Sequence, residues 1–450
     1  MLSVLNPPKV EIGFNVHSRT RIIFSSTVWF SVLSVLPKVL SLVKDVVVAA
    51  KFGAGQALDI YLMALVLIGV PVSIIAVSMQ TTLISALASK DANDAAGLLG
   101  GAIKFAVVLL ILALPIWLVL LPIVLNTLYP NLAEVNTSEL LVACLWLIPF
   151  YFTNGVNLLL YGALQARKVF WPNAVLPGLF PLSILITMWL IPDTSIRSLL
   201  IGTVAGSLCE GFVLLFISQR NRMLRLWQNS GVGLMSVVRL ALPLMVGGVI
   251  ASFSPVVEQL LAFRLGPGAV SLLSYGNKLP AAMNSLLLTA IGVIVLPHFS
   301  ELMAERQWGV CRKLYLHLSV TALVLGILIV CVGSVLADVI IRLFFERGAF
   351  TAANTREVAV VMCVYLLQLP FLLVAMISIR ALVAMRRTLI MTSISTAQLI
   401  LAGSLAFLFS SHYGVVGVAL GTTVAVMLGT GIFVAMAWYR LNEQFRSLAV

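Results

Sequence analysis

The chain has 450 residues, of which 61% are hydrophobic and 10% are charged. Soluble domains carry roughly 25% charged residues, so a water-exposed surface cannot be built from this composition and lipid must cover most of the protein. The excess of 28 Lys+Arg over 16 Asp+Glu would suggest nucleic acid in a soluble chain. Here the basic residues lie mostly at the ends of apolar runs, where they contact lipid headgroups. We therefore predict an integral membrane protein with membrane lipids, and no nucleic acid, as partners.

Apolar runs long enough to cross a bilayer recur along the whole chain. A helix of about 20 residues spans the hydrocarbon and closes its own backbone hydrogen bonds, as lipid requires. We expect helices over 23–50, 59–87, 97–126, 138–165, 169–191, 196–218, 237–263, 270–298, 311–343, 357–385, 388–410 and 414–440. The predicted fold class is all-α, a polytopic membrane protein with about 12 transmembrane helices.

Basic residues are divided unevenly between the two sides of these spans. With the N-terminus in the cytoplasm, seventeen Lys and Arg residues between Lys9 and Arg446 fall on the cytoplasmic side. The opposite loops hold six, namely Lys51, Arg197, Arg264, Arg342, Arg347 and Arg356. This asymmetry follows the positive-inside rule and predicts that both termini are cytoplasmic.

Two segments of the chain repeat one pattern at a constant offset of 213 residues. The matched pairs are Asp45 and Glu258, Lys51 and Arg264, Gly53 and Gly266, and Gly55 and Gly268. Each set places an acid inside the outer end of a helix, then a basic residue, then a Gly-rich hairpin. An even number of spans separates the two copies, so they share one orientation. Parallel repeats of this kind build secondary transporters from two lobes around a central cavity.

The repeat predicts a two-lobe organisation of six helices each. We expect a cytoplasmic N-terminal segment at 1–22, an N-lobe at 23–218, a cytoplasmic linker at 219–236, a C-lobe at 237–440 and a cytoplasmic tail at 441–450. Among the predicted loops, only this linker is long enough to hold an amphipathic surface helix.

Three of the lysines inside predicted spans stand out, because a charge at the helix centre costs about 2.5–3.5 kcal/mol on insertion scales. Lys38 follows Pro37 near the middle of the first span, Lys44 lies further towards the outside, and Lys278 lies in the eighth span. One interpretation is a cationic cavity between the lobes. Such a cavity would attract an anionic cargo, for example a phosphate or pyrophosphate, to the lysines as point charges.

The alternative interpretation is that acids neutralise these lysines by ordinary ion pairs. Asp45 follows Lys44 directly, and Glu258 lies within reach of Lys278 in this reading. Asp45, Asp59 and Glu258 are the acids expected near the lysines, and they are also candidate cavity or gate residues.

The hairpin glycines Gly53, Gly55, Gly266 and Gly268 would permit tight turns at an outer gate. Simple turns account for them equally well. Asp338 and Arg342 are four residues apart near the outer end of a predicted helix, so we expect them to form an ion pair.

Ordered polar motifs carry a resemblance to a known family. The segment KDVVVAAKFGAGQALDIYLMA resembles the first hairpin of the MurJ/MviN family, and GPGAVSLLSYGNKL followed by AIGVIVLPHFSEL is similar to its second-lobe segment. LFFERGAFTAANT at 343–355 and RALVAMRRT at 380–388 are similar to two further family segments. The resemblance covers roughly residues 25–390.

The resemblance implies a flippase of the multidrug/oligosaccharidyl-lipid/polysaccharide exporter superfamily. Such proteins carry undecaprenyl-pyrophosphate-linked sugars across the bacterial cytoplasmic (inner) membrane by alternating access, and lipid II of peptidoglycan synthesis is the MurJ cargo. Lys38, Lys44 and Lys278 match positions where the family usually has cavity arginines, and Asp45 and Asp59 match family acids. Proteins of cell-wall or polysaccharide synthesis are implied partners. The family typically has fourteen spans, whereas twelve are predicted here.

Three alternatives to a lipid II flippase stay open. An exopolysaccharide or O-antigen repeat unit is the first alternative cargo. A multidrug exporter of the same superfamily would prefer acids that attract organic cations. A membrane enzyme would need a constellation of acid and base groups, yet His17, His298, His317 and His412 are scattered near span ends. We expect a transporter with no cofactor, no metal and no catalytic residues.

Overall fold

The computed structural model describes residues 16–88, 91–128, 134–192, 195–221, 234–385 and 387–447. The first half consists of α1 (Val16–Phe52), α2 (Gln56–Val72), the π-helix η2 (Ser73–Val77), α3 (Ser78–Ala88), α4 (Ala92–Leu128), α5 (Glu134–Trp146), α6 (Ile148–Ala166), α7 (Trp171–Val175), the 3-10 helix η3 (Leu176–Gly178), α8 (Leu179–Leu190) and α9 (Arg197–Arg220). The second half consists of α10 (Leu234–Arg264), α11 (Ala269–Ala304), α12 (Trp308–Phe345), α13 (Ala352–Leu366), α14 (Leu369–Ala384) and α15 (Thr388–Ser447). Every element in the described residues is helical, and the predicted all-α class is confirmed.

Several predicted spans correspond to pairs of elements joined at a break. The span predicted at 138–165 is α5 and α6, and the one at 357–385 is α13 and α14; both second helices begin with a proline at N1 or N2. Proline cannot donate a backbone hydrogen bond within a helix, so the helix interrupts there. The last two predicted spans are merged in α15, which contains the non-helical residue Gly414 with φ 57°.

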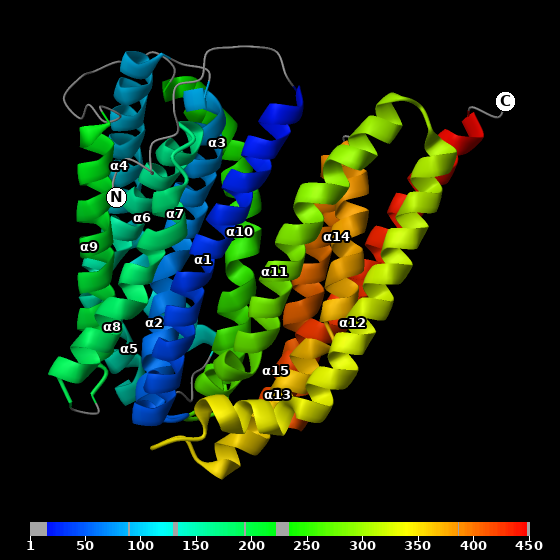
Figure 1. Ribbon diagram of the computed structural model, residues 1–450. Coiled ribbons are helices and arrows are strands. Elements are labelled where there is room, and N and C mark those ends of the chain that lie inside the picture. Colours follow the sequence, from blue (N-terminus) through cyan, green and yellow to red (C-terminus); the bar gives the residue numbers. More distant parts are fainter. Residues whose placement is uncertain are drawn as a thin grey trace.

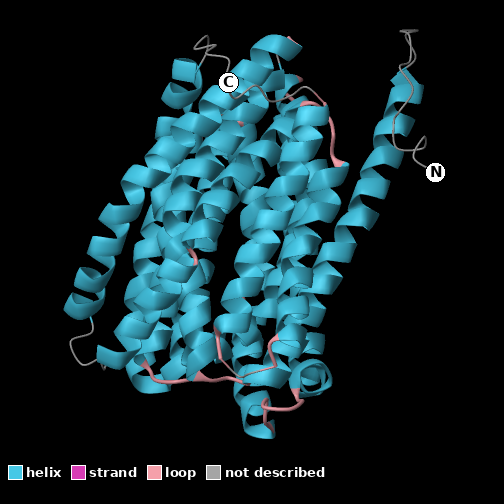
Figure 2. Cartoon of the chain, turned by 90° about the vertical axis from the view of Figure 1, so that its left-hand side faces the viewer, coloured by secondary structure: helices cyan, strands magenta, loops and turns pink. Residues whose placement is uncertain are grey.

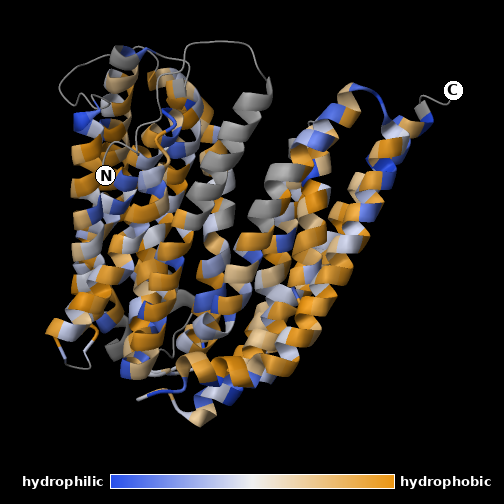
Figure 3. Ribbon diagram, viewed as in Figure 1, coloured by the Kyte–Doolittle hydropathy of each residue, from blue (hydrophilic) through white to orange (hydrophobic). Residues whose placement is uncertain are grey.

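The composition of the helices fits a lipid-facing surface. Eight helical stretches in the described residues are long and apolar enough to cross a bilayer, and the bent pair α5–α6 would make nine. Helices α1 and α11, which carry Lys38, Lys44 and Lys278, are outside this set. Hydrophobic residues predominate along the helices and hydrophilic ones gather towards their ends (Figure 3). Side chains such as Val335 and Trp189 are more than 80% exposed, which lipid tolerates and water does not.

The helices form two groups that approach each other at one end. Figure 1 shows α1 to α9 beside α11 to α15, with α10 between them, and the groups diverge away from that end. In the first group α1 packs on α7 and α8, and α9 packs on α6 and α8; in the second, α11 and α12 both pack on α13 and α14. Figure 2 shows the helices running roughly parallel, with most loops at the two ends.

Helix α10 contacts both groups. It packs against α2, η2 and α3 of the first group and against α15 of the second. The lobe boundary predicted at residue 237 therefore stays a prediction, and most of the predicted linker at 219–236 lies outside the described residues. Further contacts between the groups join α2 to α11 and α1 to α12. These contacts lie towards the end that holds the turns 53–55, 265–268 and 346–351, which we call the hairpin end.

Candidate functional site

A cluster of three charged side chains joins the two helix groups. The Asp45 carboxylate on α1 lies 2.8 Å from Lys44 Nζ and 3.1 Å from Lys278 Nζ on α11. The side chains of Lys44 and Asp45 are 14% and 11% exposed, and that of Lys278 is 33% exposed. Two formal positive charges therefore share one formal negative charge, which leaves an excess of one positive charge at this contact.

The local sequence explains how α1 presents this cluster. Lys44 and Asp45 are neighbours, about 100° apart around the helix, and both reach the side of α1 that meets α11. Desolvating a charge is tolerable when an opposite charge lies nearby. Lys278 points into the same contact from two turns inside α11.

The predicted local pair of Lys44 with Asp45 is present, but the alternative pairing of Lys278 with Glu258 is wrong. Lys278 pairs with Asp45 instead. The Glu258 carboxylate on α10 accepts a hydrogen bond from the Tyr365 hydroxyl on α13. The sequence alone does not indicate this hydrogen bond, because Glu258 and Tyr365 are 107 residues apart.

Lys278 lines two cavities. A small one of about 20 Å³ is lined by Lys44, Asp45, Tyr61, Tyr275 and Lys278 among others. A second, of about 260 Å³, is lined by Lys278 together with Ser274, Asn277, Glu258 and Tyr365. Lys278 therefore pairs with Asp45 and also borders the larger space.

Lys38, the third predicted lysine, lies apart from this cluster. Its side chain is exposed, two helical turns before Asp45, and it lines neither of the two cavities beside Lys278. Pro37 beside it packs against Gly178 of η3. The structure thus brings together Lys44, Asp45 and Lys278, and leaves Lys38 outside.

Asp59 on α2, a candidate cavity or gate acid, takes part in neither of the ion pairs that Lys44 and Lys278 form with Asp45. Its carboxylate accepts hydrogen bonds from Gly268 N at 2.6 Å and Ser271 N at 2.7 Å, and from the Ser271 hydroxyl. These amides form the first turn of α11, where unpaired N–H groups and the helix dipole favour a carboxylate. Asp59 therefore ties α2 to the start of α11 at the hairpin end.

The hairpin glycines also bring the two groups into backbone contact. A Cβ at Gly53 (φ 60°) would lie 2.6 Å from Ala349 O, and one at Gly268 (φ 91°) would lie 2.8 Å from Ala54 O. Positive φ and this close approach both favour glycine. Gly266 (φ 119°) has open space around it, and Gly55 has the extended conformation of an N-cap, with φ −138°.

A third turn completes the hairpin end. Ala349 N donates to Ala50 O at 2.8 Å, and a Cβ at Gly348 (φ 58°) would lie 2.2 Å from that oxygen. Phe350 behind the turn is 2% exposed. The motif segment LFFERGAFTAANT therefore forms a turn between α12 and α13 that packs on the end of α1.

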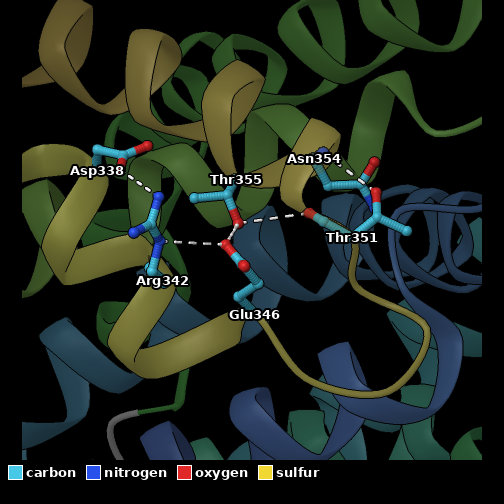
Figure 4. A network of polar contacts seen from close by, with 6 residues as sticks. All are labelled: Asp338, Arg342, Glu346, Thr351, Asn354 and Thr355. Carbon is cyan, nitrogen blue, oxygen red and sulfur yellow. Dashed lines mark hydrogen bonds and ion pairs between the residues drawn. The ribbon is translucent and has the colours of Figure 1, made fainter.

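Polar contacts hold this turn in place (Figure 4). The predicted pair of Asp338 and Arg342 is confirmed at 3.1 Å, and Arg342 Nε lies 3.6 Å from Glu346. The Thr355 hydroxyl donates to Glu346 at 2.7 Å, and Thr351 accepts from Asn354 N at the start of α13. These contacts connect the end of α12 to the beginning of α13 across the turn.

Comparisons with known proteins agree with one another. A family profile described as lipid II flippase MurJ matches residues 48–448. A probable lipid II flippase MurJ of Synechocystis sp. is 25% identical over 458 residues, covering 93% of this chain and 81% of the relative. A second, of Bdellovibrio bacteriovorus, is 24% identical over 286 residues, covering 61% of this chain and 54% of the relative.

Solved structures of related fold include a lipid II flippase MurJ in an inward closed conformation. It has a TM-score of 0.75 and 20% identity, and the match covers 94% of this chain and 91% of that one. A multidrug resistance MATE family transporter of the MOP superfamily in an inward-facing conformation has a TM-score of 0.68 and 14% identity, covering 92% of this chain and 96% of that one. At these identities the likeness concerns the fold.

Proposed function

Since this chain belongs to the lipid II flippase MurJ family, we propose that it translocates lipid II across the bacterial cytoplasmic membrane and that Lys44, Asp45 and Lys278 form the site of its pyrophosphate. The observation that supports this site is the sharing of Asp45 between two lysines of different helix groups. An anionic group can replace Asp45 as the partner of either ammonium, because lysine contacts phosphate as a mobile point charge.

The proposed orientation places the hairpin end on the outer side of the membrane. The predicted positive-inside asymmetry supports it, with both termini in the cytoplasm. On this orientation the contacts of Asp59 with α11 and of Ala50 with Ala349 close the outer end. The helix groups diverge away from the hairpin end (Figure 1), and on this orientation the headgroup would enter from the cytoplasm where they diverge.

The mechanism that fits this arrangement is alternating access. The pyrophosphate binds Lys278 and Lys44 and competes with Asp45, which weakens the ion pair between α1 and α11. Opening the outer end then requires loss of the Asp59 contacts to Gly268 and Ser271. The lobes rock, the headgroup leaves on the outer side, and the hydrocarbon tail stays in lipid throughout.

The alternative cargoes are not favoured. The family profile and both curated relatives name lipid II flippases, which weighs against an exopolysaccharide repeat unit. A multidrug exporter would draw organic cations to acids, whereas two lysines surround the shared Asp45 here. Proteins of cell-wall synthesis are proposed partners, since they would make and consume lipid II.

Complementation tests the function directly. We expect the gene to restore growth to a bacterial strain depleted of its own lipid II flippase, and the purified protein to move fluorescent lipid II across liposomes. Failure of both assays with a folded, membrane-inserted protein would overturn the proposal. Rescue of an exopolysaccharide export defect instead would transfer the assignment to that cargo.

A further inference from the structure

A separate cavity of about 550 Å³ lies among the helices of the second group. It is lined by residues of α10, α11, α13 and α15, together with Gln368. It extends from Met391, in the first turn of α15, to Glu258, six residues before the end of α10. Its volume falls within the range of about 300–1,000 Å³ typical of small-molecule sites.

Most residues that line this cavity have polar side chains, and almost none of them carries a formal charge. Glu258 is its one charged member, and hydroxyl and amide side chains line much of the rest. Three of them, Thr392, Ser395 and Thr396, follow one face of α15 at helical spacing. Polar side chains within a membrane span usually join helices by hydrogen bonds, so their partners indicate whether they serve packing.

Some of these side chains do join helices, and others do not. Gln368 Nε2 donates to Thr423 Oγ1 at 2.9 Å, which links α15 to the start of α14. Ser254, Asn277, Ser395 and Gln398, in contrast, form no side-chain hydrogen bond with the residues that the structure describes. Their donors and acceptors are therefore available to a ligand in the cavity.

A saccharide fits this chemistry better than an anion does. Sugar hydroxyls both donate and accept, and amides and hydroxyls match both capacities. A carboxylate accepts from sugar hydroxyls, and the Tyr365 hydroxyl holds Glu258 in position for this. The same negative charge disfavours a phosphate in this space.

The cavity shares lining residues with the space beside Lys278. The smaller cavity of about 260 Å³ is lined by Glu258, Asn277 and Tyr365, which also line the large one, and by Lys278. One ligand can therefore place an anionic group at Lys278 and a neutral hydroxylated group beyond Glu258. The charges of the two side chains determine which end of the ligand lies where.

We propose that the 550 Å³ cavity is the saccharide subsite of the cargo, with Asn277, Ser395 and Glu258 as contacts to the sugar. This inference rests on the proposed function and deepens it. The pyrophosphate lies at Lys278, and the sugars extend from it along α15 into the second helix group.

A comparison of the affinities for two lipids distinguishes the contribution of the saccharide subsite from that of the pyrophosphate site. Lipid II and undecaprenyl pyrophosphate share the pyrophosphate and the tail, and the second has no sugar. The wild-type protein in nanodiscs should bind lipid II more tightly. Ser395→Leu fills the cavity and should weaken lipid II binding about tenfold, the effect of about 1.4 kcal/mol, while undecaprenyl pyrophosphate binding stays unchanged.

Ser404→Leu is the matched control, because Ser404 lies on the same helix, is exposed and does not line the cavity. It should bind both lipids as the wild type does. Asn277→Ala adds no volume and should weaken lipid II binding several-fold, which keeps the test valid if Ser395→Leu fails to fold.

Wild-type lipid II affinity in folded Ser395→Leu or in Asn277→Ala would overturn the saccharide subsite, as would equal wild-type affinity for the two lipids. In those cases the pyrophosphate site would survive, provided that Lys278→Ala weakens both lipids. Binding of neither lipid to the wild type would overturn the proposed function and the subsite with it.

Discussion

Lys278 Nζ lies 3.1 Å from the Asp45 carboxylate, so an ion pair joins α11 of one helix group to α1 of the other. Asp45 also holds Lys44 at 2.8 Å, and it therefore keeps a partner when Lys278 moves away. This contact can break without leaving Asp45 as a buried charge with no partner. An unpaired buried charge is energetically costly. The ion pair is thus suited to form and break in each transport cycle.

Substitution of Lys278 tests whether its charge binds the cargo. Lys278→Ala should lower lipid II translocation at least tenfold, because one of the two ammonium groups facing the pyrophosphate is lost. The protein should stay folded and inserted, since Asp45 retains Lys44. Lys278→Arg keeps the positive charge and should retain most activity. Initial rates in liposomes measure both, and wild-type activity of Lys278→Ala would contradict the proposed site.

Lys38 should contribute less than Lys278, and in a salt-dependent way. It is exposed and lies outside the cluster around Asp45, so it can attract the headgroup only at longer range, where salt screens the interaction. Lys38→Ala should lower translocation several-fold at low salt and by little at high salt. Lys104→Ala, at another exposed lysine within α4, is the control and should change neither rate. A complete loss in Lys38→Ala at all salt concentrations would instead place Lys38 in direct contact with the cargo.

The positions of the helices were predictable from the sequence because a helix that crosses the bilayer needs about 20 consecutive apolar residues. The predicted helix at 270–298 corresponds to α11 at Ala269–Ala304, and that at 196–218 to α9 at Arg197–Arg220. Whether each predicted helix is continuous or broken was less predictable. The break at Leu147 and the one at Gln368 interrupt apolar runs, and a preference for proline in the first helical turn does not identify them in advance.

The candidate site was predictable in its residues and only partly in its contacts. A lysine in an apolar span indicates that a partner or cavity exists, and Lys44, Asp45 and Lys278 do meet. Which acid faces which lysine depends on how α1, α10 and α11 pack, and a single sequence carries no such distances. For the same reason the contacts of Asp59, a candidate cavity or gate residue, were not predicted, since its partner Ser271 is 212 residues away. The cavity along α15, in which Glu258 is the one charged lining residue, was missed because serine and threonine cost little in a membrane helix.

Loss of the Asp59 carboxylate should favour opening at the hairpin end. Asp59→Asn keeps the shape of the side chain but removes the charge that two amides and a hydroxyl contact. Hydrogen bonds to charged groups contribute about 1.5–3 kcal/mol each, so the closed state should become less favourable by about 1–3 kcal/mol. A cysteine at Ser274, which lines the cavities beside Lys278, should then react faster with an impermeant maleimide added outside.

The comparison for this experiment is Glu443→Gln, the same loss of charge at an exposed ion pair near the end of α15. It should leave the labelling rate of the cysteine at Ser274 unchanged. Equal labelling in Asp59→Asn and the wild-type background would show that Asp59 does not hold the hairpin end closed.

A covalent link across the hairpin end tests alternating access itself. Ala349 N bonds to Ala50 O at 2.8 Å, so the turn between α12 and α13 lies against the end of α1, and cysteines at these two alanines should be within reach of a short thiol cross-linker. In a background without native cysteines, the cross-linked Ala50→Cys/Ala349→Cys protein should lose translocation while still binding lipid II from the cytoplasmic side. Cleaving a reducible linker should restore the rate, and each single variant treated with the linker should stay active. Full translocation by a completely cross-linked protein would mean that the headgroup crosses without separation of these two segments, which alternating access between the helix groups does not allow.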